Sequence, residues 1–391
     1  MTSFKSLRQD AGILFLLFGC WLIGSTGQMM KNIPRHAGLF CLAGAVAVAG
    51  TLGALRWLQS RGAGQIGWGW IAAVVVLLAA LYFVLYPISQ RHILGPGSDS
   101  EDALRITASR LIHGQYPYYA RTYLGNAISP MPGAVLLAVP FYLAGRVSLQ
   151  NILWLSALAV FCARYFRLSA TSVAFILIFV LGSASSLDAF AVGDDYVTNA
   201  WYVCVLLCLF IRTFESDAGG WRRPAAGILL GLALGSRPTF IVIPPLLLAY
   251  LLQRGRGTMA ACRSVAFPVA VAVAVTLPFY LYDPRHFSPL HIRGKLDFLS
   301  PEAGNILTIA LPLLAVASAC AGFFIELTLA RLYLLAGIAI AIITLTPAVA
   351  QAVMSGFGRA GWGLMDYSIP SATYVGLWAL YRFEGKAPAT L

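Results

Sequence analysis

Three of the chain's few acidic residues stand close together, at Asp99, Glu101 and Asp102. Asp and Glu account for only 15 of the 391 residues, so the cluster concentrates negative charge. The S-x-x-E spacing from Ser98 to Glu101 predicts the start of a helix, where acids interact favourably with the helix dipole. A carboxylate in this position could instead take a proton from a reacting hydroxyl as a general base. Both interpretations fit the pattern.

We expect the predicted helix to be amphipathic, to end near Gly114 and to lie in the membrane–water interface on the outer face. Four tyrosines follow it. They are Tyr116, Tyr118, Tyr119 and Tyr123. Tyrosines in an interface usually form an aromatic belt. They could also stack on a sugar ring, which makes Tyr118 and Tyr123, together with Glu101, candidate substrate-binding residues.

Basic residues occur at two places where an anion could bind. Arg237 stands between the apolar stretches 224–236 and 238–252, where an unpaired charge is costly and usually functional. It could equally be a helix-end arginine whose charged head reaches polar surroundings. The polar segment 283–304 holds further candidates for phosphate contact or proton transfer, namely His286, His291, Arg293 and Lys295. Most charges in such a loop are simply solvated.

Metal binding has little support in the sequence. The seven cysteines and five histidines show no spacing typical of a zinc site. Asp194 and Asp195 are adjacent acids that could bind a divalent cation, as weak candidates. We therefore expect that no cofactor is required and that a divalent cation is an option.

The elements that position these residues are membrane helices. Hydrophobic residues make up 59% of the chain and charged residues 11%, which excludes a soluble globular domain and a disordered chain. Barrel-type alternation is missing, so we expect an all-α fold, a polytopic transmembrane helical bundle. The apolar stretches give about 12–13 membrane segments: 11–30, 37–58, 68–89, 131–146, 150–166, 170–187, 196–213, 224–236, 238–252, 264–282, 305–325, 329–350 and 369–383.

Charge asymmetry between the loops predicts the orientation. Lys5 and Arg8 place the N-terminus inside, and the Arg-rich segments 212–223 and 253–263 also read as cytoplasmic. The two longest polar stretches, 90–130 and 283–304, are then on the outer face. One segment between 131 and 187 must be short or not fully spanning, so that the number of crossings agrees with this orientation. Segments 224–236 and 238–252 should form a broken hairpin. The net charge of +12 is explained by lipid headgroups and topology, not by nucleic acid.

This order of features resembles the GT-C superfamily of membrane glycosyltransferases. An acid follows the first core span, then come an amphipathic helix, the G-x-x-P-Y sequence of residues 114–118 and a proline-rich segment around Pro130 and Pro132. The layout is most similar to the polyprenyl-phosphate-mannose-dependent mannosyltransferase branch. A glycine-rich stretch before Arg237-Pro238 also fits, since that branch often has Lys-Pro there.

The resemblance covers residues 68–300, with 1–67 as an extra N-terminal helix pair and 301–391 as C-terminal helices of a single transmembrane domain. It implies an inverting transfer of a sugar from a polyprenyl-phosphate donor to a glycolipid, polysaccharide or protein acceptor. The family acid maps best onto Asp99, with Asp102 as the alternative base. Arg237, and secondarily Arg293 and His291, would face the phosphate; a histidine in this region is catalytic in some relatives.

We therefore expect a glycosyltransferase of a bacterial inner membrane whose site faces the periplasm. The main alternative is a polytopic transporter or lipid flippase. Such proteins tend to carry ionisable residues at mid-membrane, whereas the acids of this chain gather on the outer loops. A catalytically inactive accessory subunit is a third hypothesis.

Overall fold

The fold is all-helical. The computed structural model describes residues 4–60, 66–91, 97–166, 169–215, 220–255 and 257–384. Within these ranges the strand-type pairing is limited to an isolated bridge between Arg121 and Ala127. The predicted all-α class is therefore confirmed.

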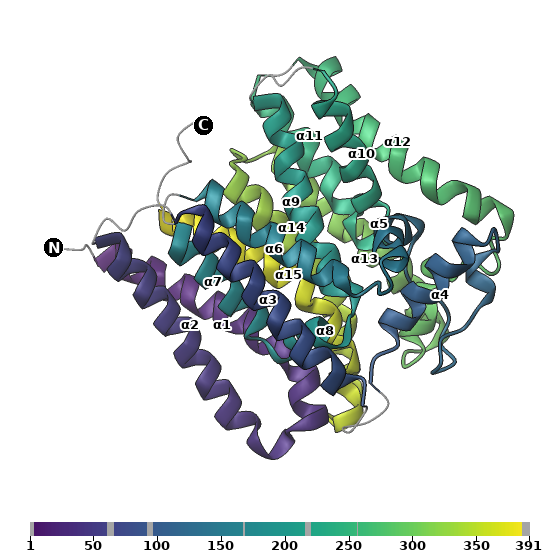
Figure 1. Ribbon diagram of the computed structural model, residues 1–391, viewed down its shortest axis with the longest axis horizontal. Helices are drawn as coiled ribbons and strands as arrows, with labels where there is room; N and C mark the ends of the chain where they lie inside the picture. Colours follow the sequence, from purple (N-terminus) through teal and green to yellow (C-terminus); the bar gives the residue numbers. More distant parts are fainter. Residues whose placement is uncertain are drawn as a thin grey trace.

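The α-helices cross one another in a bundle, with the N-terminal pair along one edge of the view and α12 along another (Figure 1). Their bounds are α1 (Phe4–Asn32), α2 (Ala37–Ser60), α3 (Trp68–Ser89), α4 (Ser100–Ile112), α5 (Pro132–Leu143), α6 (Leu149–Tyr165), α7 (Ser169–Leu181), α8 (Ala184–Val192), α9 (Asp195–Glu215), α10 (Arg222–Leu234), α11 (Ile243–Gln253), α12 (Thr258–Tyr282), α13 (Pro301–Cys320), α14 (Leu329–Met354) and α15 (Ile369–Glu384). The 3-10 helices are η1 (Pro34–His36), η2 (Pro117–Tyr119), η3 (Pro238–Val242), η4 (Ser288–Leu290), η5 (Ile292–Leu296), η6 (Ala321–Phe323) and η7 (Arg359–Ser368).

Seven helices of the described ranges are long and apolar enough to cross a membrane, namely α1, α2, α3, α9, α12, α13 and α14. An eighth crossing results if α7 and α8 count together, although these two helices meet at an angle of 86°. The chain is thus a multi-pass membrane protein. The expected 12–13 segments exceed the number of helices that have spanning length.

The difference arises because several apolar segments form short helices. α5 has 12 residues, α10 has 13 and α11 has 11, whereas a spanning helix needs about 20. α5 packs against α4, α10 and α12 and so accounts for the short segment expected between 131 and 187. Hydropathy identifies apolar runs, but the breaks at prolines and glycines decide how long each helix becomes.

The helices α10 and α11 form the expected broken hairpin. η3 separates them, with Arg237 immediately before it. The backbone N–H groups of Met131 and Gly133 donate to the carbonyl oxygens of Ser236 (3.4 Å) and Gly235 (3.0 Å). The start of α5 is therefore attached to the break by two backbone hydrogen bonds.

The central helix α9 extends between two ends of the bundle. Its first residue, Asp195, pairs with Arg237, while Glu215 at its other end accepts a hydrogen bond from Tyr250 at 2.8 Å. Its 21 residues span about 31 Å. Segment 97–130 lies at the Asp195 end, and the basic residues Arg212, Arg223 and Arg254 lie at the Glu215 end. The two loop classes that the charge pattern distinguishes are therefore at opposite ends; Arg256 lies outside the described residues.

The N-terminal helix is fastened to segments far along the chain. The side-chain amide of Gln28 in α1 donates to Asp188 in α8 at 2.9 Å and more weakly to Asp366 in η7 at 3.4 Å. Ser185 donates to the other oxygen of Asp366 at 2.6 Å. Gly27 lies so close to Asp366 that a Cβ atom there would be 2.4 Å from its carboxylate.

We expect Gly133→Ala to destabilise the fold. A Cβ atom at Gly133 would lie 2.1 Å from the backbone oxygen of Leu232, so α5 or α10 must shift. The cost should be about 1–3 kcal/mol, measured as a lower Tm of the detergent-solubilised protein. Gly50→Ala in α2 is the matched control, because no atom lies within 4 Å of its Cβ position. Equal Tm values for the two variants would contradict the close contact between α5 and α10.

Candidate functional site

The helix α4 begins one residue later than the S-x-x-E pattern predicts. Asp99 is the residue before its first turn, and its side chain makes no capping hydrogen bond. Glu101 does not reach back to Ser98, because other partners hold it. The capping-box prediction is therefore wrong, whereas the predicted end is confirmed by Gly114, whose φ of +66° favours glycine.

Asp99 and Asp102 both accept hydrogen bonds from the turn formed by residues 122–126. Asp99 accepts hydrogen bonds from the Thr122 hydroxyl and from the Asn126 amide, the latter at 2.8 Å. Asp102 accepts the backbone N–H of Tyr123 at 2.9 Å and pairs with Arg105 at 2.6 Å. The two candidate bases thus orient the loop that carries Tyr123.

Glu101 lies at the centre of a hydroxyl network. Its Oε2 accepts a hydrogen bond from Tyr86 at 2.8 Å, and its Oε1 accepts one from Ser148 at 2.5 Å. The Tyr82 hydroxyl lies 2.5 Å from the Ser148 oxygen. Burial raises the pKa of Glu101, while the hydrogen bonds from Ser148 and Tyr86 and the charge of Arg146 oppose that rise.

A cavity of about 320 Å³ opens beside Glu101 and Asp102. It is bordered by the end of α3, the start of α4 and the α5–α6 connection. Its lining contains two carboxylates, two arginines and three tyrosines, which can hydrogen-bond to hydroxyls and pair with an anion. The lining residues are Tyr86, Gln90, Ser98, Glu101, Asp102, Arg105, Tyr123, Tyr142, Gly145, Arg146 and Val147.

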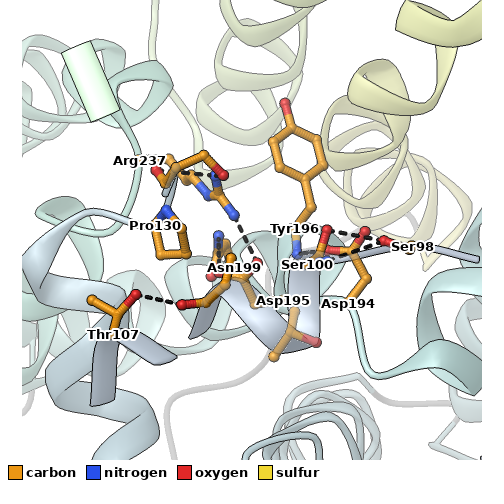
Figure 2. Close-up of polar contacts among 12 residues, drawn as sticks. Ser98, Ser100, Thr107, Pro130, Asp194, Asp195, Tyr196, Asn199 and Arg237 are labelled. Carbon is orange, nitrogen blue, oxygen red and sulfur yellow. Dashed lines mark hydrogen bonds and ion pairs between the residues drawn. The ribbon is translucent and has the colours of Figure 1, made fainter. Parts of the chain in front are cut away.

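A buried ion pair joins the start of α9 to the α10–α11 break. Arg237 Nη2 lies 2.7 Å from Asp195 Oδ1, and the two side chains are only 9% and 1% exposed. Figure 2 shows the arginine reaching toward Asp195 near Pro130. Arg237 Nη1 makes long contacts to Ser129, at 3.4 Å to the hydroxyl. Its buried Nε has no hydrogen-bond partner among the residues that the structure describes.

Asp194 connects the two acidic clusters. It accepts the backbone N–H of Tyr196 at 2.8 Å and lies beside Ser98 and Ser100 at the start of α4 (Figure 2). Burial, and next the charge of Asp195, raise the pKa of Asp194 to about 7.

Gly193 lets the two clusters approach each other. A Cβ atom there would be 3.1 Å from the Glu101 carboxyl carbon and 2.5 Å from the Ser148 Cβ, and its φ is +84°. Acids that are 92 or more residues apart in the sequence therefore meet at one end of the bundle.

These acids do not form a metal centre in the structure. Asp195 is occupied by Arg237, and Asp194 points toward α4. Across the described ranges, no group of three or more His, Cys, Asp or Glu side chains could hold a metal ion. The weak candidates Asp194 and Asp195 therefore gain no further ligand.

Tyr118 and Tyr123 have different surroundings. Tyr123 is exposed and lines the cavity. Tyr118 is 5% exposed, packs edge-on against Phe287 at 4.8 Å and donates to the Pro130 carbonyl at 3.2 Å. Tyr118 thus joins segments 97–130 and 283–300, and it is not among the residues that line the cavity.

The candidates from the second polar loop are not part of the cavity lining either. His286 lies 2.8 Å from Asp283, which also accepts a hydrogen bond from Tyr119. His291 is exposed, and Arg293 pairs with Asp297 at 2.9 Å.

Lys295 is the loop residue that connects to the buried pair. Its ammonium lies 3.8 Å from the centre of the Tyr367 ring. Tyr367 in turn packs edge-on against Tyr196, over which Arg237 lies at 5.2 Å. Lys295 is therefore connected to Arg237 through the side chains of Tyr367 and Tyr196.

The cavity lining includes polar residues that were not site candidates from the sequence, among them Tyr86, Gln90, Tyr142 and Arg146. One signal could have identified part of this set, since Tyr82, Tyr86 and Gln90 recur every four residues near the end of an apolar span. That spacing puts polar groups on one helix face. No local sequence pattern indicates Arg146. It lies in the connection between α5 and α6 and reaches the cavity only through the fold.

Comparison with known proteins adds no relative. No family model matches the chain, and none of the curated proteins or solved structures matches it.

Breaking the buried pair should be strongly destabilising. Asp195→Asn leaves the Arg237 charge buried without a counter-charge, at a cost of about 3–5 kcal/mol. We expect a correspondingly lower Tm in detergent. The double variant Asp195→Leu with Arg237→Met should unfold at a higher temperature than Asp195→Asn, because no buried charge is left. If the single variant keeps the parental Tm, the pair is not buried as described.

Proposed function

We propose that the protein is an integral-membrane glycosyltransferase that moves a sugar from a polyprenyl-phosphate donor to a lipid, glycan or protein acceptor. The observation that carries the proposal is a polar cavity lined by the α4 acids Glu101 and Asp102, at the same end of an apolar bundle as Asp194 and the buried Asp195–Arg237 pair. Substrates with a lipid tail present their headgroups at that depth. The charge asymmetry of the loops supports the proposal that this end faces the periplasm at a bacterial inner membrane.

The proposed reaction is a direct displacement that inverts the anomeric carbon. The acceptor hydroxyl gives its proton to a carboxylate, and its oxygen bonds to the anomeric carbon. The bond between that carbon and the donor phosphate oxygen breaks, and its electron pair leaves with the polyprenyl phosphate. A cation stabilises the developing charge. Arg237 suits this role, because its Nε has no partner within the described part of the chain.

We assign the proton-accepting role to Glu101. Asp99 is not among the residues that line the cavity, and the negative charge of Asp102 is paired with Arg105 at 2.6 Å. Glu101 lines the cavity, and its raised pKa makes it a better base than an ordinary carboxylate. Asp99 and Asp102 then act by orienting the 122–126 turn.

Glu101→Gln should lower the rate of sugar transfer by at least about 100-fold, because the amide cannot take the proton. The measurement is release of undecaprenyl phosphate from synthetic undecaprenyl-phosphate mannose, glucose and arabinose, with a bacterial lipid extract as acceptor. Asp99→Asn and Asp102→Asn should be slower through weaker positioning. Glu326→Gln is the control, since that carboxylate is 84% exposed at the opposite end of the bundle.

Two results would contradict the proposal. The first is full transfer activity in Glu101→Gln together with both aspartate variants. The second is that the unchanged protein releases polyprenyl phosphate from none of the donors and carries no such lipid when its bound lipids are analysed by mass spectrometry.

The acid limb of the pH–rate profile should report the pKa of the Glu101 carboxylate. A base must be deprotonated, so activity should fall as the pH drops through the pKa of Glu101, which lies above the ordinary glutamate value. Tyr86→Phe removes a hydrogen bond that lowers this pKa, so the acid limb should move to higher pH. Tyr119→Phe, in η2, should leave the limb in place, because the Tyr119 hydroxyl donates to Asp283 and not to Glu101. A limb that is identical in Tyr86→Phe and the unchanged protein would argue against Glu101.

One observation favours a transporter or flippase instead. Buried charges at a helix break, such as Arg237 and Asp195, are typical of transport pathways. A transporter should move a short-chain fluorescent lipid across proteoliposomes without releasing polyprenyl phosphate from a donor. Release without lipid movement would favour the glycosyltransferase.

A further inference from the structure

The cavity contains a cation that the proposed reaction does not use. The guanidinium carbon of Arg146 lies 4.4 Å from the centre of the Tyr86 ring. Across the described ranges, no carboxylate oxygen is paired with Arg146 within 4.0 Å. The second cavity arginine, Arg105, is already paired with Asp102. Arg146 is thus the cavity cation whose charge is available to a ligand.

The chain turn after α5 sets the position of Arg146. Gly145 has a φ of +98°, a conformation that favours glycine. Two residues beyond Arg146, Ser148 donates its hydroxyl to Glu101 at 2.5 Å. The same short connection therefore supplies both the cation of the cavity wall and the group that orients the proposed base.

The remaining lining suits hydroxyl groups. Tyr86, Tyr123 and Tyr142 bring phenol groups, and Glu101 and Asp102 bring carboxylates that accept hydrogen bonds. A guanidinium can bind a phosphate through two parallel N–H groups, as it also binds a carboxylate. The cavity therefore combines one phosphate-binding group with several hydroxyl-binding groups.

We propose that this cavity binds a phosphorylated polyol, with its phosphate on Arg146 and a hydroxyl directed at Glu101. Because the bound hydroxyl would be the one that attacks, this ligand is the acceptor's headgroup, and that identification rests on the proposed function. Binding itself requires neither the donor nor the reaction. It is therefore measured separately from sugar transfer.

The test measures the binding of three probes to the full-length protein in detergent by isothermal titration calorimetry. Dihexanoyl phosphatidylglycerol has a phosphate and two headgroup hydroxyls, dihexanoyl phosphatidylcholine has a phosphate without hydroxyls, and glycerol 3-phosphate has no acyl chains. We expect phosphatidylglycerol to bind at least about tenfold more tightly than phosphatidylcholine. Arg146→Gln should weaken phosphatidylglycerol binding by about tenfold or more.

Two further variants make the result specific. Arg331→Gln is the matched control, because Arg331 pairs with Glu326 at the other end of the bundle, and it should bind phosphatidylglycerol unchanged. Arg146→Lys keeps the charge but loses the fork of N–H groups, so it should bind with intermediate affinity. Each variant's Tm is compared with that of the unchanged protein, so that unfolding is not mistaken for lost binding.

Each outcome has a definite meaning. Equal binding of phosphatidylglycerol and phosphatidylcholine, or unchanged binding in a folded Arg146→Gln variant, would overturn the proposal. Glycerol 3-phosphate binding as tightly as phosphatidylglycerol, and lost in Arg146→Gln, would support the site and identify a soluble phosphate ester as its source. Arg146-dependent binding without any sugar transfer would leave this site standing and remove the proposed function.

Discussion

An arginine remains charged inside an apolar helix bundle, so its burial is very costly unless a counter-charge is buried with it, and Asp195 is that counter-charge for Arg237. The pair fixes the start of α9 against the break between α10 and α11. The same break receives backbone hydrogen bonds from Met131 and Gly133, so it also fixes the start of α5. α4 packs on α5 and lies beside Asp194, so the acids of its first turn depend on this one pair.

Features that depend on local sequence could be predicted. The apolar runs identified the membrane helices, Gly114 marked the end of α4, and Arg237-Pro238 marked the hairpin break. Helix length was less predictable, because a run such as 131–146 looks like a span, although α5 ends after 12 residues. The charge pattern also distinguished the loops that lie at opposite ends of α9.

Features that depend on contacts between distant segments could not be predicted. Glu101 fits a capping box on spacing alone, but it accepts hydrogen bonds from Tyr86 in α3 and from Ser148, the residue before α6. The partner of Arg237 stands 42 residues earlier, and no local pattern selects Asp195 over Asp194. Tyr118 could not be distinguished from Tyr123 either, although one is buried between loops and the other lines the cavity.

The contact of Gln28 with Asp188 and Asp366 has a consequence for biosynthesis. α1 is made before η7, yet it is held partly by a residue of η7 that lies 338 positions later. During translation α1 is therefore in the membrane before α8 and η7 are made. The polar side chain of Gln28 must be tolerated there without these two partners. α1 can make its contact with Asp366 only after η7 has been made. A chain released before residue 366 would carry every span of the core and still fail to close around its own beginning.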